Sequence, residues 1–243
     1  MRVDVLTLFP EMFQGPMSES LIQKAREKGL LNLRVINIRD FALDKHKTAD
    51  DTPYGGGPGM VMKADIVAQA IRSLKMEANK KVILLCPTGE KLTQAKVNQL
   101  ARFEQLVFVC GHYEGIDERV APMIDEKVSI GDFVVTGGEL PAMIVIDAVA
   151  RQIPGVVKEV SSVEGDSFFA GWLDFPSFTK PETFEGAKVP EVLLSGHHAQ
   201  IKRWRKKAAL QKTLFQRPDL LAEIEFNEGD RALMTELFRE EGQ

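Results

Sequence analysis

The chain has 243 residues with a formal net charge of −4, and 44% of the residues are hydrophobic and 27% charged. This length and composition exclude a disulfide- or metal-stapled miniprotein, wholesale disorder, collagen-like repeats and coiled coils. No apolar run approaches the roughly 20 residues of a membrane helix, and Asp4 and Glu11 interrupt the N-terminal apolar stretch, so we expect a cytoplasmic protein without secretion signal or membrane segment.

Strand and helix signals alternate along residues 1–150. Apolar β-rich runs alternate with helical spacing in the order strand 3–9, helix 10–29, strand 31–38, helix 63–77, strand 81–86, a helical stretch from 93, strand 106–110, a short run 128–130 and helix 139–153. This order predicts an α/β domain with a mostly parallel sheet.

Three glycine-containing segments follow predicted strands, at 86–89, 110–115 and 131–138. Because ligands of parallel sheets bind outside the carboxyl ends of the strands, we expect these segments to form one pocket for a nucleotide-like ligand. Cys86 and Cys110 end two of the strands and lack metal-ligand spacing, so we interpret both as reduced packing residues.

Residues 40–59 show no periodicity, which is typical of a functional or mobile loop. Gly55, Gly57 and Gly59 match the GxGxG pattern of nucleotide-binding folds, and glycines leave backbone N–H groups free for a ligand. However, a polar stretch precedes them where that motif requires a strand. The sequence is compatible with two interpretations of residues 40–59, a ligand-binding loop and a flexible surface loop.

From 161 to 190 the composition changes to Ser, Gly, Asp, Phe and Pro without periodicity, which indicates a linker with ordered turns. We predict a cofactor domain at 1–160, a linker at 161–175 and a helical domain at 176–243. In the last, Ser195 is expected to cap a helix, and a short helix is expected from Pro218. One face of the capped helix is expected to carry Ile201, Trp204, Ala208 and Phe215.

Charge is distributed unevenly in this C-terminal part. Residues 192–218 contain no Asp or Glu and seven cations, namely Lys202, Arg203, Arg205, Lys206, Lys207, Lys212 and Arg217. Residues 219–243 contain eight acidic residues and only two basic residues, Arg231 and Arg239. A basic block beside an acidic tail points to a phosphate backbone as partner, and a solvated helix face is the alternative.

Six motifs together carry a family resemblance. They are DDTPYGGGPGM, CGHYEGIDERV, SIGDFVVTGGELPAM, RQIPGV, DSFxxGxLDxP and SGHHAQIKRWR. In this order they resemble the bacterial tRNA (guanine-37-N1)-methyltransferases of the TrmD type, which belong to the SPOUT superfamily. The resemblance runs from the first strand to about residue 220.

The resemblance implies a SPOUT-type, mostly parallel sheet with a deep trefoil knot, followed by a small helical C-terminal domain. It also implies S-adenosylmethionine bound at the knot, the tRNA anticodon stem-loop as partner, and a homodimer whose active sites are shared between subunits. Nothing in the periodicity of the chain predicts a knot.

Several site residues follow from the resemblance by motif position. The expected cofactor-binding residues are Gly111, Tyr113, Ile130, Gly131, Asp132, Phe133, Val134, Val135, Gly138 and Leu140. The expected substrate-binding residues are Asp50, Gly59, Arg203 and Arg205. Small residues with free backbone groups suit adenine edges and ribose hydroxyls, and apolar side chains suit the ring.

The reaction must remove a proton from guanine N1 while negative charge develops on O6. By motif position, Asp166 is the expected general base and Arg151 the residue that stabilises the guanine oxygen. Glu114 is a candidate Mg²⁺ ligand together with Asp166. Without the resemblance, Asp166 is a linker carboxylate and Arg151 a helix-end cation.

This chain departs from the usual family pattern at Phe178, Lys180, His112 and Thr136, where Tyr, Arg, Arg and Ser are frequent. These departures affect peripheral contacts, because an Arg-to-Lys change weakens a bidentate contact. Two other function classes remain: a noncatalytic RNA-binding factor on the same fold, and a metabolic nucleotide-binding enzyme. The first would need no titratable base, and the second gives no reason for the acid-free basic block.

Overall fold

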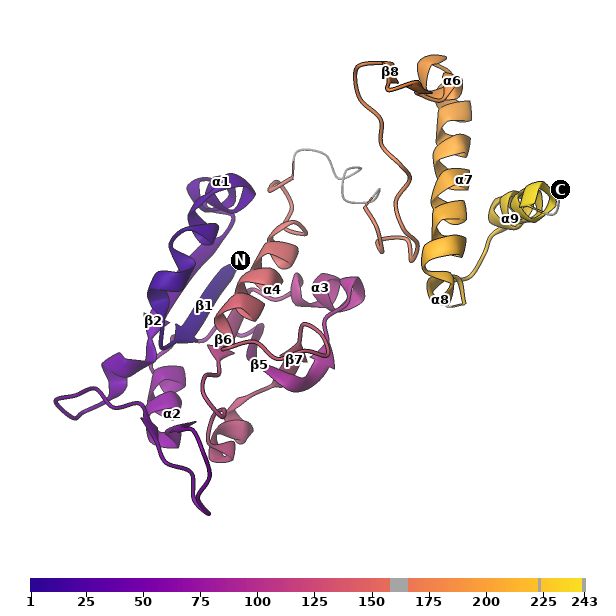
Figure 1. The fold of residues 1–243 in the computed structure, drawn as a ribbon. Helices are drawn as coiled ribbons and strands as arrows, with labels where there is room; N and C mark the ends of the chain where they lie inside the picture. The colour runs from indigo at the N-terminus through magenta and orange to yellow at the C-terminus, as the bar shows by residue number, and fades with distance from the viewer. Residues whose placement is uncertain (158–165, 223, 242–243) are drawn as a thin grey trace. The chain divides into compact units, whose positions relative to one another are not determined.

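The computed structural model describes residues 1–157, 166–222 and 224–241. The chain divides into two compact units, Met1–Val160 and Ser161–Gln243 (Figure 1). The predicted boundary after residue 160 and the first part of the predicted linker, 161–165, lie outside the described residues. Within the described residues, no helix is both long and apolar enough to cross a bilayer.

A five-stranded parallel sheet in the order β2-β1-β6-β5-β7 forms the centre of the first unit. Its strands are β1 (Arg2–Thr7), β2 (Asn32–Asn37), β5 (Lys80–Lys91), β6 (Gln105–Cys110) and β7 (Glu126–Ser129). Every residue of β6 is buried, as the apolar run predicts for a central strand covered on both faces. The predicted α/β class with a mostly parallel sheet is therefore confirmed.

Each face of the sheet packs against its own set of helices. Leu106 and Phe108 of β6 belong to one core, whereas Val107 and Val109 belong to the other, because successive side chains of a strand point to opposite faces. The first core includes residues of α1 (Ser20–Glu27), α3 (Gln94–Leu100) and α4 (Glu139–Ala150). The second includes residues of α2 (Ala64–Arg72) and the 3₁₀ helices η3 (Ile38–Phe41) and η4 (Glu118–Met123).

Several predicted elements differ from the structure. The helix expected at 10–29 is two 3₁₀ turns, η1 (Pro10–Phe13) and η2 (Pro16–Ser18), followed by α1, because each proline starts a new turn. The expected helices 63–77 and 139–153 are shorter, ending at Arg72 and Ala150. The loop 40–59 contains β3 (Asp50–Asp51), which pairs antiparallel with β4 (Val61–Met62).

The second unit is built on two helices, α7 (His198–Gln216) and α9 (Glu228–Glu241). Leu210 of α7 packs with Leu233 and Leu237 of α9, and Trp172 joins this cluster. The unit also contains the hairpin β8 (Thr183–Phe184) and β9 (Ala187–Lys188), α6 (Glu191–Leu194) and α8 (Pro218–Leu221). The short helix expected from Pro218 is confirmed, whereas α6, α9 and the hairpin were not predicted.

The start and the buried face of α7 differ from the prediction. The N-cap is His197, and the Ser195 hydroxyl instead accepts a hydrogen bond from the backbone N–H of His197 at 3.2 Å. The buried residues are Ala209, Leu210 and Thr213, and Phe215 is 61% exposed. The predicted face was wrong at Phe215 because α9, which was not foreseen, packs along a neighbouring stripe of α7.

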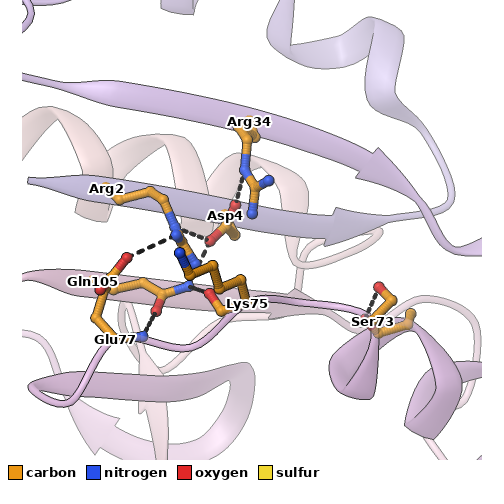
Figure 2. A network of polar contacts seen from close by, with 8 residues as sticks. Arg2, Asp4, Arg34, Ser73, Lys75, Glu77 and Gln105 are labelled. Carbon is orange, nitrogen blue, oxygen red and sulfur yellow. Dashed lines mark hydrogen bonds and ion pairs between the residues drawn. The ribbon is translucent and has the colours of Figure 1, made fainter.

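A buried carboxylate connects the strands of the sheet at one end (Figure 2). Asp4 of β1 is fully buried and accepts hydrogen bonds from Arg2 at 3.0 Å, from Gln105 of β6 at 2.7 Å and from Arg34 of β2. The side-chain amide oxygen of Gln105, Oε1, in turn accepts a hydrogen bond from the backbone N–H of Glu77 at 2.8 Å. A buried charge is tolerated when it is paired in this way.

We expect Asp4→Ala to lower the unfolding free energy of the first unit by about 3–5 kcal/mol, because Arg2 and Gln105 lose a buried partner. Urea denaturation measures this change. Glu77→Ala is the matched control: Glu77 pairs with the same Arg2 at 2.9 Å, but its side chain is 41% exposed, so a loss below about 1 kcal/mol is expected. Equal losses in the two variants would contradict the assignment of Asp4 as the central residue of the network.

Candidate active site

A cavity of about 330 Å³ lies at the carboxyl ends of β6 and β7 and beside residues 84–88 of β5. Residues 84–88, 111–116, 128–131 and 133–138 line it, together with Pro141 of α4. All three glycine-containing segments that follow predicted strands contribute to this lining. Parallel strands bring the segments to one edge of the sheet, so the expectation of a single pocket is confirmed.

Eight of the ten expected cofactor-binding residues line this cavity: Gly111, Tyr113, Ile130, Gly131, Phe133, Val134, Val135 and Gly138. The other two are not among the lining residues. The Asp132 side chain is 77% exposed and pairs with Lys91, and Leu140 is 47% exposed on α4. Residues 84–85 and Pro141 line the cavity without having been predicted, because their apolar side chains carry no chemical signal.

A close backbone contact between two loops shapes the cavity. The Gly138 N–H donates to the carbonyl of Gly111 at 2.8 Å, and His112 forms an isolated bridge with Gly137. A Cβ on Gly138 would lie 2.7 Å from the Cα of Cys110, nearer than side-chain carbons approach a backbone. Glycine is therefore required where the segment after β7 crosses the segment after β6.

Glu139, directly after these glycines, is a buried carboxylate with 1% exposure. Its Oε1 accepts a hydrogen bond from the Thr7 hydroxyl at 2.7 Å, and its Oε2 lies 3.8 Å from His112 Nδ1. A carboxylate in the first turn of a helix also interacts favourably with the helix dipole. Glu139 thus joins β1, α4 and the loop after β6. No local pattern in the sequence predicts this role of Glu139.

Two expected substrate-binding residues lie near the cavity wall formed by Tyr113 and Glu114, Gly59 directly and Asp50 through Arg39. Asp50 lies 3.8 Å from Arg39, whose guanidinium also donates to the Tyr113 hydroxyl at 3.2 Å. Gly59 has a left-handed φ of +84°, and the Glu114 side chain fills the space that a Cβ would need there. Gly59, at the end of the 40–59 loop, and Arg39, directly before this loop, therefore meet the CGHYEG loop. Arg39 was not predicted, because a lone arginine beside an aspartate is not a distinctive motif.

The two expected catalytic residues belong to different units. Arg151 is the C-cap of α4 and is half-buried. Asp166 is exposed in the second unit, and its backbone carbonyl accepts from the Phe169 N–H at 3.3 Å. For the predicted metal site of Glu114 and Asp166, the described residues contain no group of three His, Cys, Asp or Glu side chains that could hold an ion.

The basic block of α7 is partly neutralised by α9. Arg203 and Lys207 both pair with Glu236, and Lys206 pairs with Asp230. Hydrogen bonds from Lys207 and Arg203 lower the pKa of Glu236. Of the two arginines expected to bind substrate, Arg203 is thus engaged by α9, whereas the Arg205 guanidinium lies over the Phe175 ring at 4.8 Å from its centroid.

The first unit defines an α/β protein with a ligand cavity at the carboxyl edge of a parallel sheet, and the second unit adds a helix rich in cations. A family model described as tRNA (guanine-1)-methyltransferase TrmD matches residues 1–223. The chain therefore belongs to the TrmD family.

Curated relatives named tRNA (guanine-N(1)-)-methyltransferase match nearly the whole chain. The relative from Desulforamulus reducens is 54% identical over 241 residues, which cover 98% of this chain and 95% of the relative. The relative from Dictyoglomus turgidum is 49% identical over 240 residues, which cover 99% and 98%. The relative from Syntrophomonas wolfei is 51% identical over 237 residues, which cover 98% and 97%.

The two cysteines differ in their exposure, and only Cys86 lines the cavity. Cys86 is half-buried on the cavity wall, whereas Cys110 is buried, and burial together with the nearby Glu139 raises the pKa of the Cys110 thiol. At pH 8.5 we expect a thiol reagent to modify Cys86 and leave Cys110 unmodified until urea unfolds the protein, because the thiolate is the reactive form. Mass spectrometry of digested protein locates the label. Equal labelling of both thiols in the native protein would contradict this assignment.

The same raised pKa gives a pH dependence of stability. The unfolded thiol ionises at its ordinary pKa while the folded thiol stays neutral, so the contribution of Cys110 to stability is complete below that pKa. It is lost as the pH rises above it. Cys110→Ala is expected to flatten the alkaline part of the stability profile relative to Cys86→Ala.

Proposed function

We propose that this protein transfers a methyl group from S-adenosylmethionine to N1 of the guanosine at position 37 of tRNA, next to the anticodon. The observation that carries the proposal is membership of the TrmD family over residues 1–223. The cavity, lined by the family's motif segments, gives independent support.

The cavity residues fit S-adenosylmethionine. Gly131 and Gly138 bring the backbone to the surface of the cavity, which leaves room for a flat ligand there. Phe133, Val134 and Val135 provide apolar cover for a ring. When bound, the cofactor supplies an electrophilic methyl group on a sulfonium.

Asp166 acts as the general base in this proposal and takes the proton from guanine N1. Arg151 donates hydrogen bonds to O6, where negative charge develops as that proton leaves. Arg39 and Asp50 hold the wall of the cavity beside Tyr113, on the side where the 40–59 loop meets it. These residues position the purine edge.

The proposed assembly is a homodimer in which each active site takes residues from both subunits, and the cofactor domain carries a deep trefoil knot. The family resemblance implies both properties. The 137–138 segment lies in close backbone contact with the 110–112 segment, where glycines permit it. A Mg²⁺ ion held by Glu114 and Asp166 stays a prediction: within the described residues, no three His, Cys, Asp or Glu side chains gather at one place.

We expect Asp166→Ala to lower methyl transfer by about 10²-fold or more, the usual contribution of a positioned base, while the affinity for S-adenosylmethionine stays unchanged. The measurement is mass mapping of the methylated nucleoside after incubation with S-adenosylmethionine and an unmodified tRNA transcript. Asp174→Ala in the same motif is the control, since Asp174 pairs with Lys212 at 2.7 Å on the unit surface.

Two outcomes of this experiment would contradict the proposal. Full turnover of Asp166→Ala would remove Asp166 as the base. No 1-methylguanosine with the wild-type protein would overturn the methyltransferase function itself and would favour a noncatalytic RNA-binding factor.

The glycine contact at the cavity leads to a second test. We expect Gly138→Ala to weaken S-adenosylmethionine binding at least about tenfold in isothermal titration, because its methyl group forces the loop away from Cys110. Gly15→Ala is the matched control: a Cβ there meets no atom within 4 Å and the backbone φ is −70°. Unchanged affinity in Gly138→Ala would show that the cofactor does not depend on this contact.

A further inference from the structure

A second concave surface lies within the helical unit. It is a groove of about 450 Å³ lined by residues 175–180, Glu182, Val189 and residues of α6 and α7. Its side-chain walls are mainly Phe175, Phe178, Trp204, Arg205, Ile201 and Leu194. This groove shares no lining residue with the cavity of the first unit.

The groove combines aromatic rings with a guanidinium. Arg205 lies over the Phe175 ring at 4.8 Å, and the rings of Phe178 and Trp204 have centroids 6.2 Å apart with an interplanar angle of 57°. Phe178 remains 47% exposed and Leu194 53% exposed, so large apolar surfaces face solvent in a concave setting. Aromatic faces and an Arg plane are the groups on which unstacked nucleobases pack.

Charge at the groove favours a polyanion over an apolar peptide. Residues 198–216 contain no Asp or Glu. Arg203, Lys206 and Lys207 are engaged by α9, but Arg205 and Lys202 make no ion pair within the described residues. These two are three positions apart on one helix and therefore lie on the same side. Lys180 adds a donor and Glu182 an acceptor at the groove lining.

We propose that this groove binds one unstacked nucleobase of an RNA, stacked against Phe178 and the guanidinium plane of Arg205, with Lys202 contacting a flanking phosphate. The proposal rests on the proposed function, since it assigns part of the tRNA contact to a defined place. Among the cations of α7, Arg203, Lys206 and Lys207 pair with α9 and Lys212 pairs with Asp174, which leaves Arg205 and Lys202 for the RNA. Of the cations of α7, RNA contact at the groove then requires only Arg205 and Lys202.

The test couples one side chain to one base. Affinity is measured for the full-length protein and an unmodified tRNA transcript, and for transcripts with a single abasic nucleotide at each anticodon-loop position in turn. Phe178→Leu removes the ring and keeps an apolar side chain. Phe184→Leu is the matched control, because Phe184 is 65% exposed on β8 and lies outside the groove lining.

We expect Phe178→Leu to weaken tRNA binding about tenfold, the usual size of one lost base–aromatic stack, and Phe184→Leu to leave it unchanged. One abasic position is expected to weaken the wild type by a similar factor and to have no further effect in Phe178→Leu. Arg205→Lys, which keeps the charge and loses the stacking plane, should show the same coupling. It also covers the case in which Phe178→Leu fails to fold.

Three results would overturn the proposal. One is equal affinity of Phe178→Leu and Phe184→Leu, and another is abasic losses of the same size in wild type and variant at every position. The third is a change of molecular mass in solution on Phe178→Leu, which would assign the groove to a second copy of the chain. This test measures RNA affinity and not methyl transfer. A wild-type protein that makes no 1-methylguanosine would therefore overturn the proposed function, while the affinity measurements would still test the groove.

Discussion

The contact between two backbone segments at Gly138 and Cys110 is the constraint on which the cavity depends. The segment after β7 must cross the segment after β6 at a distance that leaves no room for a Cβ. The Gly138 N–H to Gly111 carbonyl bond closes this crossing. Because this contact brings lining residues 111–116 and 133–138 together, it helps to set the shape of the cavity.

Two buried carboxylates hold the sheet around this crossing. Asp4 connects β1 with its neighbours β2 and β6 near the start of the strands, through Arg34 and Gln105. Glu139 acts at the carboxyl end, where Thr7 of β1 donates to it beside His112. Buried charges cost desolvation, and they are retained where several partners satisfy them. Here their partners come from separate elements, so each carboxylate also specifies which elements meet.

The helical unit divides its charges by a similar logic. The acidic side chains of α9 pair with Arg203, Lys206 and Lys207, while Leu233 and Leu237 pack against Leu210. The net charge of a segment therefore says little about which cations are available to a polyanion. Within the described residues, Lys202 and Arg205 of α7 make no ion pair, whereas Arg203, Lys206 and Lys207 are engaged by α9.

Local chemistry in the sequence determined the strands of the five-stranded sheet, most helices, the single pocket at the carboxyl edge of that sheet and the motifs that carry family membership. The apolar runs of β5 and β6 and the glycine segments after them are readable because periodicity and glycine act within a few residues. Tertiary structure alone decided the roles of Asp4, Arg39 and Glu139, the outward pairing of Asp132, and the engagement of Arg203 by α9. Each of these depends on a partner distant in the chain, and no local pattern records which distant residues will become neighbours.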